Sequence, residues 1–96
     1  MEREQVLQLL AQHKPELAQR YGVLRLALFG SAARNTANAE SDIDILVAFD
    51  GPATSQRYFG VQFYLEDMLD RPVDLVTEKA LRTELRPQIE GEALHV

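Results

Sequence analysis

Two aspartates separated by one residue, Asp42 and Asp44, directly precede the apolar run 45–47. In a β-strand alternate side chains point to the same face, and a rise of about 3.3 Å per residue places these carboxylates about 7 Å apart. Carboxylates this close repel each other unless a partner neutralises them, and Mg²⁺ with oxygen ligands does so. The pair therefore favours a metal site at the mouth of a buried strand. The alternative is a solvated strand end that carries two acids by chance.

A third aspartate, Asp74, lies inside the apolar segment 73–76, where a charge requires a partner. A salt bridge to a nearby arginine is one explanation. If the strand of Asp74 is instead the neighbour of the strand of Asp44, three acids gather at one place. Three acids can hold two metal ions, and two metals about 3.5–4 Å apart stabilise both the attacking and the leaving oxygen of phosphoryl transfer.

A Gly-Ser pair, Gly30-Ser31, ends another apolar segment 11 positions before Asp42. Glycine lets the backbone approach a ligand closely, and the N–H groups that begin a following helix bind anions. Ser31 adds a hydroxyl donor, and Arg34, one helical turn on, can pair with a phosphate oxygen. Alone, the pair would indicate a plain turn with Ser31 as helix N-cap. Combined with the Asp-x-Asp pattern, it predicts a site for nucleotide phosphates.

These side chains need a fold that brings several strand ends together. The spacing of apolar residues predicts three strands and three longer helices: strands over 23–29, 43–49 and 73–76, and helices over 2–20, 56–69 and 78–90. We expect Pro15 to interrupt the first helix or to start a second piece, and Pro87 to mark a break or a fresh start. The end, 93–96, is either a short strand or a loose tail. The fold class is α/β (α+β), a small mixed β-sheet with flanking helices.

Composition limits the classes of function. The chain has 96 residues, no cysteine, and 10 Lys+Arg against 15 Asp+Glu, for a net charge of −5. The lack of cysteine excludes disulfides, zinc–thiolate sites and thiol nucleophiles. The acidic balance argues against direct binding of nucleic acid. No apolar run approaches the roughly 20 residues of a membrane span, so we expect one cytoplasmic domain, 1–96, with no membrane association.

The segments 30–34, 41–47 and 73–76 together resemble the minimal nucleotidyltransferase (MNT) family of the DNA polymerase beta superfamily. Gly-Ser followed by Asp-x-Asp is the signature of that family, and the resemblance covers nearly the whole chain. One departure is Asn35, at a position where relatives often have glycine. Asparagine tolerates the left-handed region of backbone space almost as well, so the departure concerns the loop and not the metal ligands.

The resemblance implies roles for individual residues. Asp42 and Asp44 correspond to ligands of both metals, Mg²⁺ or Mn²⁺, and Asp74 to the third carboxylate, on the metal that activates the acceptor. These three are the expected catalytic and metal-binding residues. Gly30 and Ser31 correspond to the nucleotide-phosphate site, and we add Arg34 to it from its position.

The resemblance also implies a biological setting. Family members are commonly the antitoxin half of a toxin–antitoxin pair, whose other half is a small helical HEPN ribonuclease. The implied reaction transfers AMP from ATP to a tyrosine of that toxin, within a hetero-oligomer. A chain of 96 residues leaves little beyond the nucleotide site to hold an acceptor, which favours an acceptor that is itself a folded protein.

Two other hypotheses remain. In the first, the chain is a non-catalytic antitoxin that covers the basic RNA-binding face of the toxin with its acidic surface. Retention of three strand-associated aspartates argues against this, because a blocker has no need of them. In the second, the acceptor is a small molecule or a nucleic acid, which the short chain and its net charge of −5 disfavour.

Overall fold

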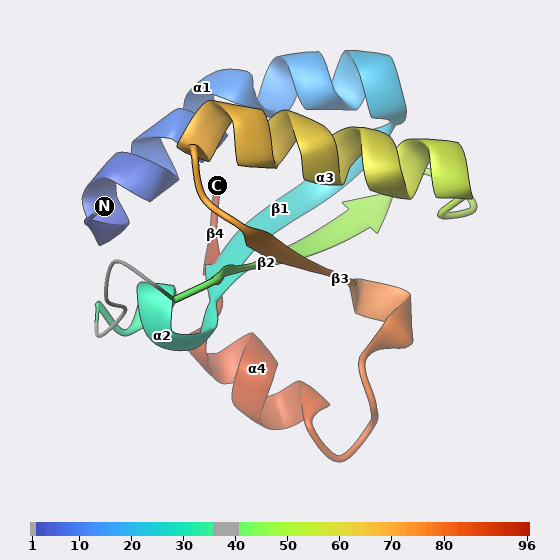
Figure 1. Cartoon of the computed structure of the whole chain (residues 1–96). Coiled ribbons are helices and arrows are strands. Elements are labelled where there is room, and N and C mark those ends of the chain that lie inside the picture. Colours follow the sequence, from blue (N-terminus) through green and yellow to red (C-terminus); the bar gives the residue numbers. More distant parts are fainter. Residues whose placement is uncertain (1, 36–40) are drawn as a thin grey trace.

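The computed structural model describes residues 2–35 and 41–96, and it has two long helices on one face of a four-stranded sheet (Figure 1). The sheet order is β3-β2-β1-β4, where β2 runs parallel to β3, and β1 runs antiparallel to both β2 and β4. The predicted mixed sheet with flanking helices is confirmed. The elements in chain order are α1 (Arg3–Tyr21), β1 (Val23–Phe29), α2 (Gly30–Ala33), β2 (Ile43–Phe49), α3 (Ser55–Leu69), β3 (Val73–Thr77), the 3₁₀ turn η1 (Glu78–Ala80), α4 (Arg86–Glu92) and β4 (Leu94–His95).

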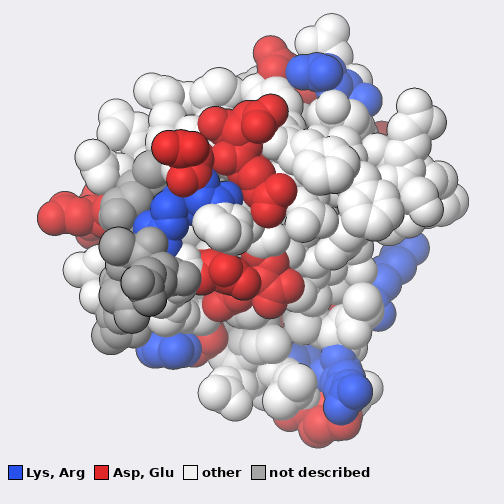
Figure 2. All heavy atoms as spheres, in the orientation of Figure 1, with Lys and Arg blue, Asp and Glu red and all other residues white. Residues whose placement is uncertain are grey.

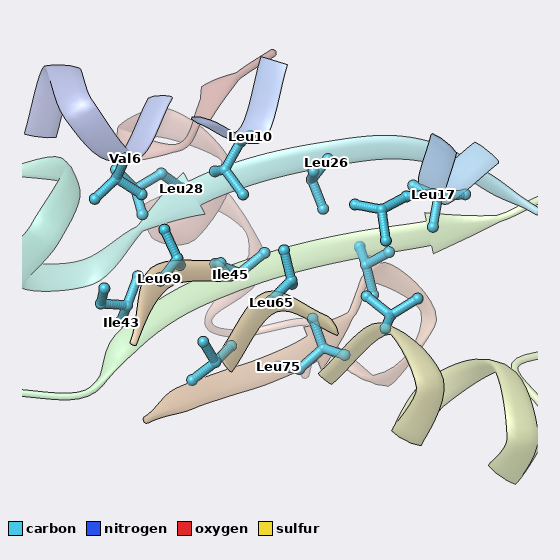
Figure 3. Close-up of a cluster of buried hydrophobic side chains, with 14 of the residues drawn as sticks. Val6, Leu10, Leu17, Leu26, Leu28, Ile43, Ile45, Leu65, Leu69 and Leu75 are labelled. Carbon is cyan, nitrogen blue, oxygen red and sulfur yellow. The ribbon is translucent and has the colours of Figure 1, made fainter. Parts of the chain in front are cut away.

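One face of the sheet carries the main hydrophobic core, beneath α1 and α3 (Figure 3). Each helix turns one apolar stripe inward, because residues three or four positions apart share a face. Burying one such side chain stabilises the fold by about 1.5–3 kcal/mol. The fully buried side chains of this core are Val6, Leu10 and Leu17 of α1, Leu26 and Leu28 of β1, Ile45 and Val47 of β2, and Val61, Leu65 and Leu69 of α3.

Helix α1 is continuous through Pro15, so the expected interruption is wrong. Proline removes one backbone hydrogen bond, to the carbonyl four residues earlier. Both Pro15 and Ala11, whose carbonyl loses its partner, lie on the exposed side of α1, where water can take its place. The buried contacts of Leu10 and Leu17 on either side then hold the helix together.

The C-terminal region differs from the single helix expected over 78–90. It forms the turn η1 and then the separate helix α4, in which Pro87 occupies the first turn, so the alternative of a fresh start is correct. The end of the chain is a short strand: β4 pairs with β1, Leu94 opposite Leu28 and His95 opposite Ala27.

The second face of the sheet is covered less completely. Ala27, Phe29 and Leu46 form a smaller cluster there with Leu81, and Ile89 packs against its edge. Helix α4, which carries Ile89, contributes no fully buried side chain. Within residues 2–35 and 41–96, none of the helices is both long and apolar enough to cross a bilayer.

Candidate functional site

Strand pairing places Asp44 and Asp74 side by side. In the parallel pair β2–β3, Asp44 stands in register with Asp74. Because side chains alternate along a strand, Asp44 points to the face opposite Ile43 and Ile45, which are buried in the main core. The condition left open in the sequence, that these two strands are neighbours, is therefore met. Both carboxylates lie on the less covered face of the sheet.

Side chains of α3 fix the outer edge of β3, the strand that carries Asp74. The Tyr58 hydroxyl donates to the carbonyl of Leu75 at 2.5 Å, and the Glu66 carboxylate accepts from the backbone N–H of Val73 at 3.1 Å. Backbone groups at a sheet edge lack a neighbouring strand, so these bonds satisfy them on both sides of Asp74. Tyr58 and Glu66 are positioning residues that no sequence motif indicated.

Asp42 lies at the entrance to β2 and is exposed. The backbone N–H of Ile43 donates to the carbonyl of Pro72 at 3.0 Å, and the Arg71 guanidinium donates to the carbonyl of Ser41. These bonds tie the start of β2 to the segment that leads into β3. The backbone around Asp42 is therefore fixed next to the Asp44–Asp74 pair.

The environment of Asp44 favours its protonated form. Burial raises the pKa of Asp44 to about 6, assisted by repulsion from Asp74, a hydrogen bond with Asp74 and repulsion from Asp42, while Arg34 acts in the opposite direction. A carboxylate whose pKa is raised by both burial and its neighbours is one that a cation would stabilise. Figure 2 shows red acidic side chains in the middle of the view, where Figure 1 places β2 and β3.

Gly30 follows β1 directly and lies against Asp44, because Phe29 is the strand partner of Asp44. Its φ is +69°, a left-handed conformation that glycine adopts without strain. A Cβ at this position would lie 2.9 Å from the carboxyl carbon of Asp44 and closer still to its Oδ2. Only glycine fits this close approach to Asp44.

Ser31 and Arg34 lie on and after the short helix α2. The helix begins at Gly30, with Phe29 as its N-cap, so the expectation that Ser31 is the cap is wrong. Ser31 is instead a half-buried residue inside the helix, next to the Gly30 backbone. Arg34 is the C-cap, and Asn35 after it has a φ of +60°, the left-handed conformation anticipated for that position. The small and polar residues at 35–41 predict a loop, most of which lies outside the described residues.

The site also contains Glu92, which sequence reasoning missed. Its Oε1 accepts from the backbone N–H of Gly30 at 3.2 Å, and its Oε2 accepts from Arg34 Nη1 at 2.9 Å. Glu92 is separated from these partners by 62 and 58 positions, so no local motif could indicate the contact.

The carboxylate oxygens of this site suit a hard divalent cation that binds together with a nucleotide. Among the residues that the structure describes, no group of three His, Cys, Asp or Glu side chains is already arranged around a metal position. Mg²⁺ commonly takes one or two protein carboxylates and completes its shell with water and substrate phosphates. The in-register pair Asp44–Asp74, with Asp42 beside it, supplies oxygen ligands of that kind.

We expect Asp44→Asn to stabilise the metal-free protein above about pH 6. The folded-state pKa of Asp44, about 6, exceeds the unfolded value near 3.9, so its favourable contribution is present at low pH and is lost as pH rises through 6. Two pKa units correspond to about 3 kcal/mol, and partial exposure reduces this to roughly 1–2 kcal/mol.

Urea unfolding in EDTA at pH 7.5 and pH 4 measures this effect on the free energy of unfolding. The gain should be largely gone at pH 4, where Asp44 is protonated in the parent. Asp67→Asn, which removes an exposed carboxylate on α3, is the charge-matched control and should show no such gain. If Asp44→Asn is no more stable than the parent at pH 7.5, the prediction that ionised Asp44 destabilises the folded protein is wrong.

Comparison with known proteins shows the family to which the chain belongs. The nucleotidyltransferase domain family matches residues 10–96. The chain is 34% identical over 93 residues to protein adenylyltransferase MntA of Thermococcus cleftensis, covering 97% of this chain and 94% of that protein. A solved structure of a candidate minimal nucleotidyltransferase has a TM-score of 0.79 at 36% identity, covering 98% of this chain and 95% of that one.

A more distant likeness shows the fold. A chain of the solved complex between a tri-AMPylated HEPN toxin of Shewanella oneidensis and an MNT antitoxin has a TM-score of 0.65 at 24% identity. The match covers 93% of this chain and 70% of that one. Since the family model spans most of the chain and relatives match it almost end to end, the protein belongs to the nucleotidyltransferase family, among its minimal MNT-type members.

Proposed function

We propose that this nucleotidyltransferase is a metal-dependent protein adenylyltransferase, which transfers AMP from ATP to a tyrosine hydroxyl of a cognate HEPN ribonuclease toxin. It thereby acts as the antitoxin of that partner, in the cytoplasm, as a single domain spanning residues 1–96. The observation that carries the proposal is the in-register pair Asp44–Asp74 against the Gly30 backbone. The name of the Thermococcus relative and the AMPylated toxin in the Shewanella complex support the choice of reaction and partner.

In the proposed reaction the acceptor oxygen attacks the α-phosphorus of ATP. A new O–P bond forms, the bond between the α-phosphorus and the bridging oxygen breaks, pyrophosphate leaves, and the hydroxyl proton passes to solvent. Gly30, Ser31 and Arg34 bind the phosphates, and their donors orient the α-phosphorus toward the acceptor. Asp42, Asp44 and Asp74 would hold the metal.

Two Mg²⁺ ions, or Mn²⁺ in their place, would lower the pKa of the acceptor hydroxyl and neutralise charge on the leaving pyrophosphate. The carboxylates contribute mainly by holding fixed negative charge where these ions are needed, since positioning and charge stabilisation account for most catalysis of this type. The net charge of −5 disfavours direct binding of nucleic acid. We therefore propose that the acceptor hydroxyl belongs to a protein.

Intact-mass measurement of the partner tests the proposal. A purified cognate HEPN protein is incubated with the chain, ATP and Mg²⁺, and its mass should increase by one or more AMP groups. EDTA should abolish the increase, and peptide mapping should place the groups on tyrosine. A partner that is neutralised but keeps its original mass would instead identify the chain as a blocking antitoxin.

We expect Arg34→Ala and Ser31→Ala to weaken binding of Mg·ATP. Loss of a hydrogen bond to a charged group costs roughly 1.5–3 kcal/mol, or about 10- to 150-fold in Kd. Calorimetric titration measures the Kd. Arg57→Ala, which removes an arginine paired with Asp50 at 2.9 Å, is the matched control. A lowered melting temperature with unchanged Kd would limit either residue to a structural role.

A further inference from the structure

The carboxylate of Glu92, at the C-terminal end of α4, binds the donors assigned above to phosphate. One oxygen accepts from the Gly30 N–H and the other from the Arg34 guanidinium. The Glu92 side chain is 22% exposed and that of Arg34 is 53% exposed. The Glu92 carboxylate therefore bridges the Gly30 N–H, at the start of helix α2, and the guanidinium of Arg34, the C-cap of that helix.

The Gly30 N–H can serve only one strong acceptor at a time, because a backbone N–H carries a single proton. An ATP phosphate oxygen that takes this proton must displace the Oε1 of Glu92. Arg34 has five N–H donors, but a phosphate beside Glu92 would also meet the like charge of its carboxylate. Glu92 and phosphate thus exclude each other at Gly30.

The structure leaves Glu92 able to move aside. Helix α4 has no fully buried side chain and rests on partly buried Ile89 and Ala93. Elements with few buried contacts open locally at low free-energy cost. The chain after Glu92 stays attached, because Leu94 and His95 of β4 pair with β1. A shift of the Glu92 side chain, or of the last turn of α4, frees both donors without unfolding the sheet.

We propose that Glu92 is a positioning residue of the nucleotide site, an internal carboxylate that occupies the Gly30 and Arg34 donors until a nucleotide phosphate replaces it. The inference rests on the proposed function, because it assigns those donors to ATP. Glu92 keeps Gly30 and Arg34 oriented in the free protein and competes with ATP, so it sets the nucleotide affinity.

Calorimetric titration with Mg·ATP tests this inference on the parent, Glu92→Gln and Glu90→Gln. Glutamine keeps the shape of Glu92 but removes its charge, and neutral hydrogen bonds are about half as strong as charge-assisted ones. We expect Glu92→Gln to bind Mg·ATP about fivefold to tenfold more tightly. Glu90→Gln removes the same charge from the same helix, at a residue paired with Arg86 instead, and should stay within about twofold of the parent.

A second measurement follows the Gly30 amide directly. In the nucleotide-free protein its ¹H–¹⁵N resonance should shift on Glu92→Gln and stay in place on Glu90→Gln. In the Arg34→Ala background, the affinity gained through Glu92→Gln should shrink, because one of the two competing contacts is already lost.

The outcomes separate the two proposals. If the parent and all variants fail to bind Mg·ATP, the proposed function fails and the inference fails with it. If the parent binds Mg·ATP but Glu92→Gln binds no more tightly than Glu90→Gln, the inference alone is overturned. A lower melting temperature of Glu92→Gln at unchanged Kd likewise overturns it, since that result describes a purely structural ion pair.

Discussion

The double variant Asp42→Asn/Asp44→Asn is expected to lose AMP transfer below detection and still to bind its partner protein. Asparagine keeps nearly the shape of aspartate but removes two charges from the site that would hold metal. Removal of one preorganised charge-stabilising group typically costs about 10²–10³-fold in rate, and here two are lost at once, so at least about 10³-fold is expected. The fold should persist, because Asp42 is exposed and Asp44 is destabilising when ionised.

Two measurements distinguish a catalytic antitoxin from one that only blocks its partner. They are the rescue of growth in cells that express the toxin, and the intact mass of that toxin. Asp67→Asn/Glu84→Gln, which removes two exposed acids outside the site, is the control with the same change in net charge. If catalysis protects the cell, the site variant loses rescue and adduct together while the control keeps both. Rescue by the site variant, with no adduct in any strain, would sink the catalytic proposal and support neutralisation by binding alone.

The strands could be predicted from sequence because burial imposes its own pattern on the residues. The runs at 23–29 and 43–49 are apolar and bounded by glycine or acidic residues, and the structure places β1 and β2 at the same bounds. The alternation of Asp42, Ile43 and Asp44 also predicts that the two acids share a face. That inference needs only the period of a strand, with no knowledge of its neighbours.

Which strands are neighbours could not be derived from the residues. The register that sets Asp44 beside Asp74 depends on the crossover through α3 and on the bonds from Tyr58 and Glu66 to β3. Asp44 and Asp74 are 30 positions apart, and the bonds from Tyr58 and Glu66 span 17 and 7 positions, so no regular spacing of residue types encodes the register. The sequence therefore identified the aspartates as candidate ligands, but whether Asp44 and Asp74 lie close together remained conditional. The family resemblance supplied that expectation.

Local rules failed where tertiary contacts outweighed them. Pro15 is a helix breaker by its chemistry, but the buried faces of α1 on both sides of it keep the helix whole. Ser31 is a good N-cap by type, yet Gly30 already adopts the conformation that opens α2. Glu92, at the end of an exposed helix, had no distinguishing feature in the sequence and gains its role only from contact with Gly30 and Arg34.

Gly30→Ala is expected to have the second large effect, on both stability and nucleotide binding. An alanine Cβ would lie 2.9 Å from the Asp44 carboxyl carbon. The alanine would also have to adopt the φ of +69° that Gly30 has. The left-handed conformation costs an L-residue about 1–2 kcal/mol, and the displacement of Asp44 adds to it, so we expect a loss of roughly 2–4 kcal/mol in unfolding free energy. Binding of Mg·ATP should fall at least about tenfold, because the Gly30 N–H and the Asp44 carboxylate can no longer keep their present positions.

Gly91→Ala is the matched control, since a Cβ on that helical glycine meets nothing within 4 Å. Alanine is the better helix former by about 1 kcal/mol, so this variant should be as stable as the parent or slightly more stable. Urea unfolding and calorimetric titration measure both variants. In an Asp44→Ala background the stability cost of Gly30→Ala should fall toward the backbone term alone, because the carboxylate is gone. An unchanged cost in that background would show that Gly30 is required only for its φ, and not for the close approach to Asp44 on which the proposed site depends.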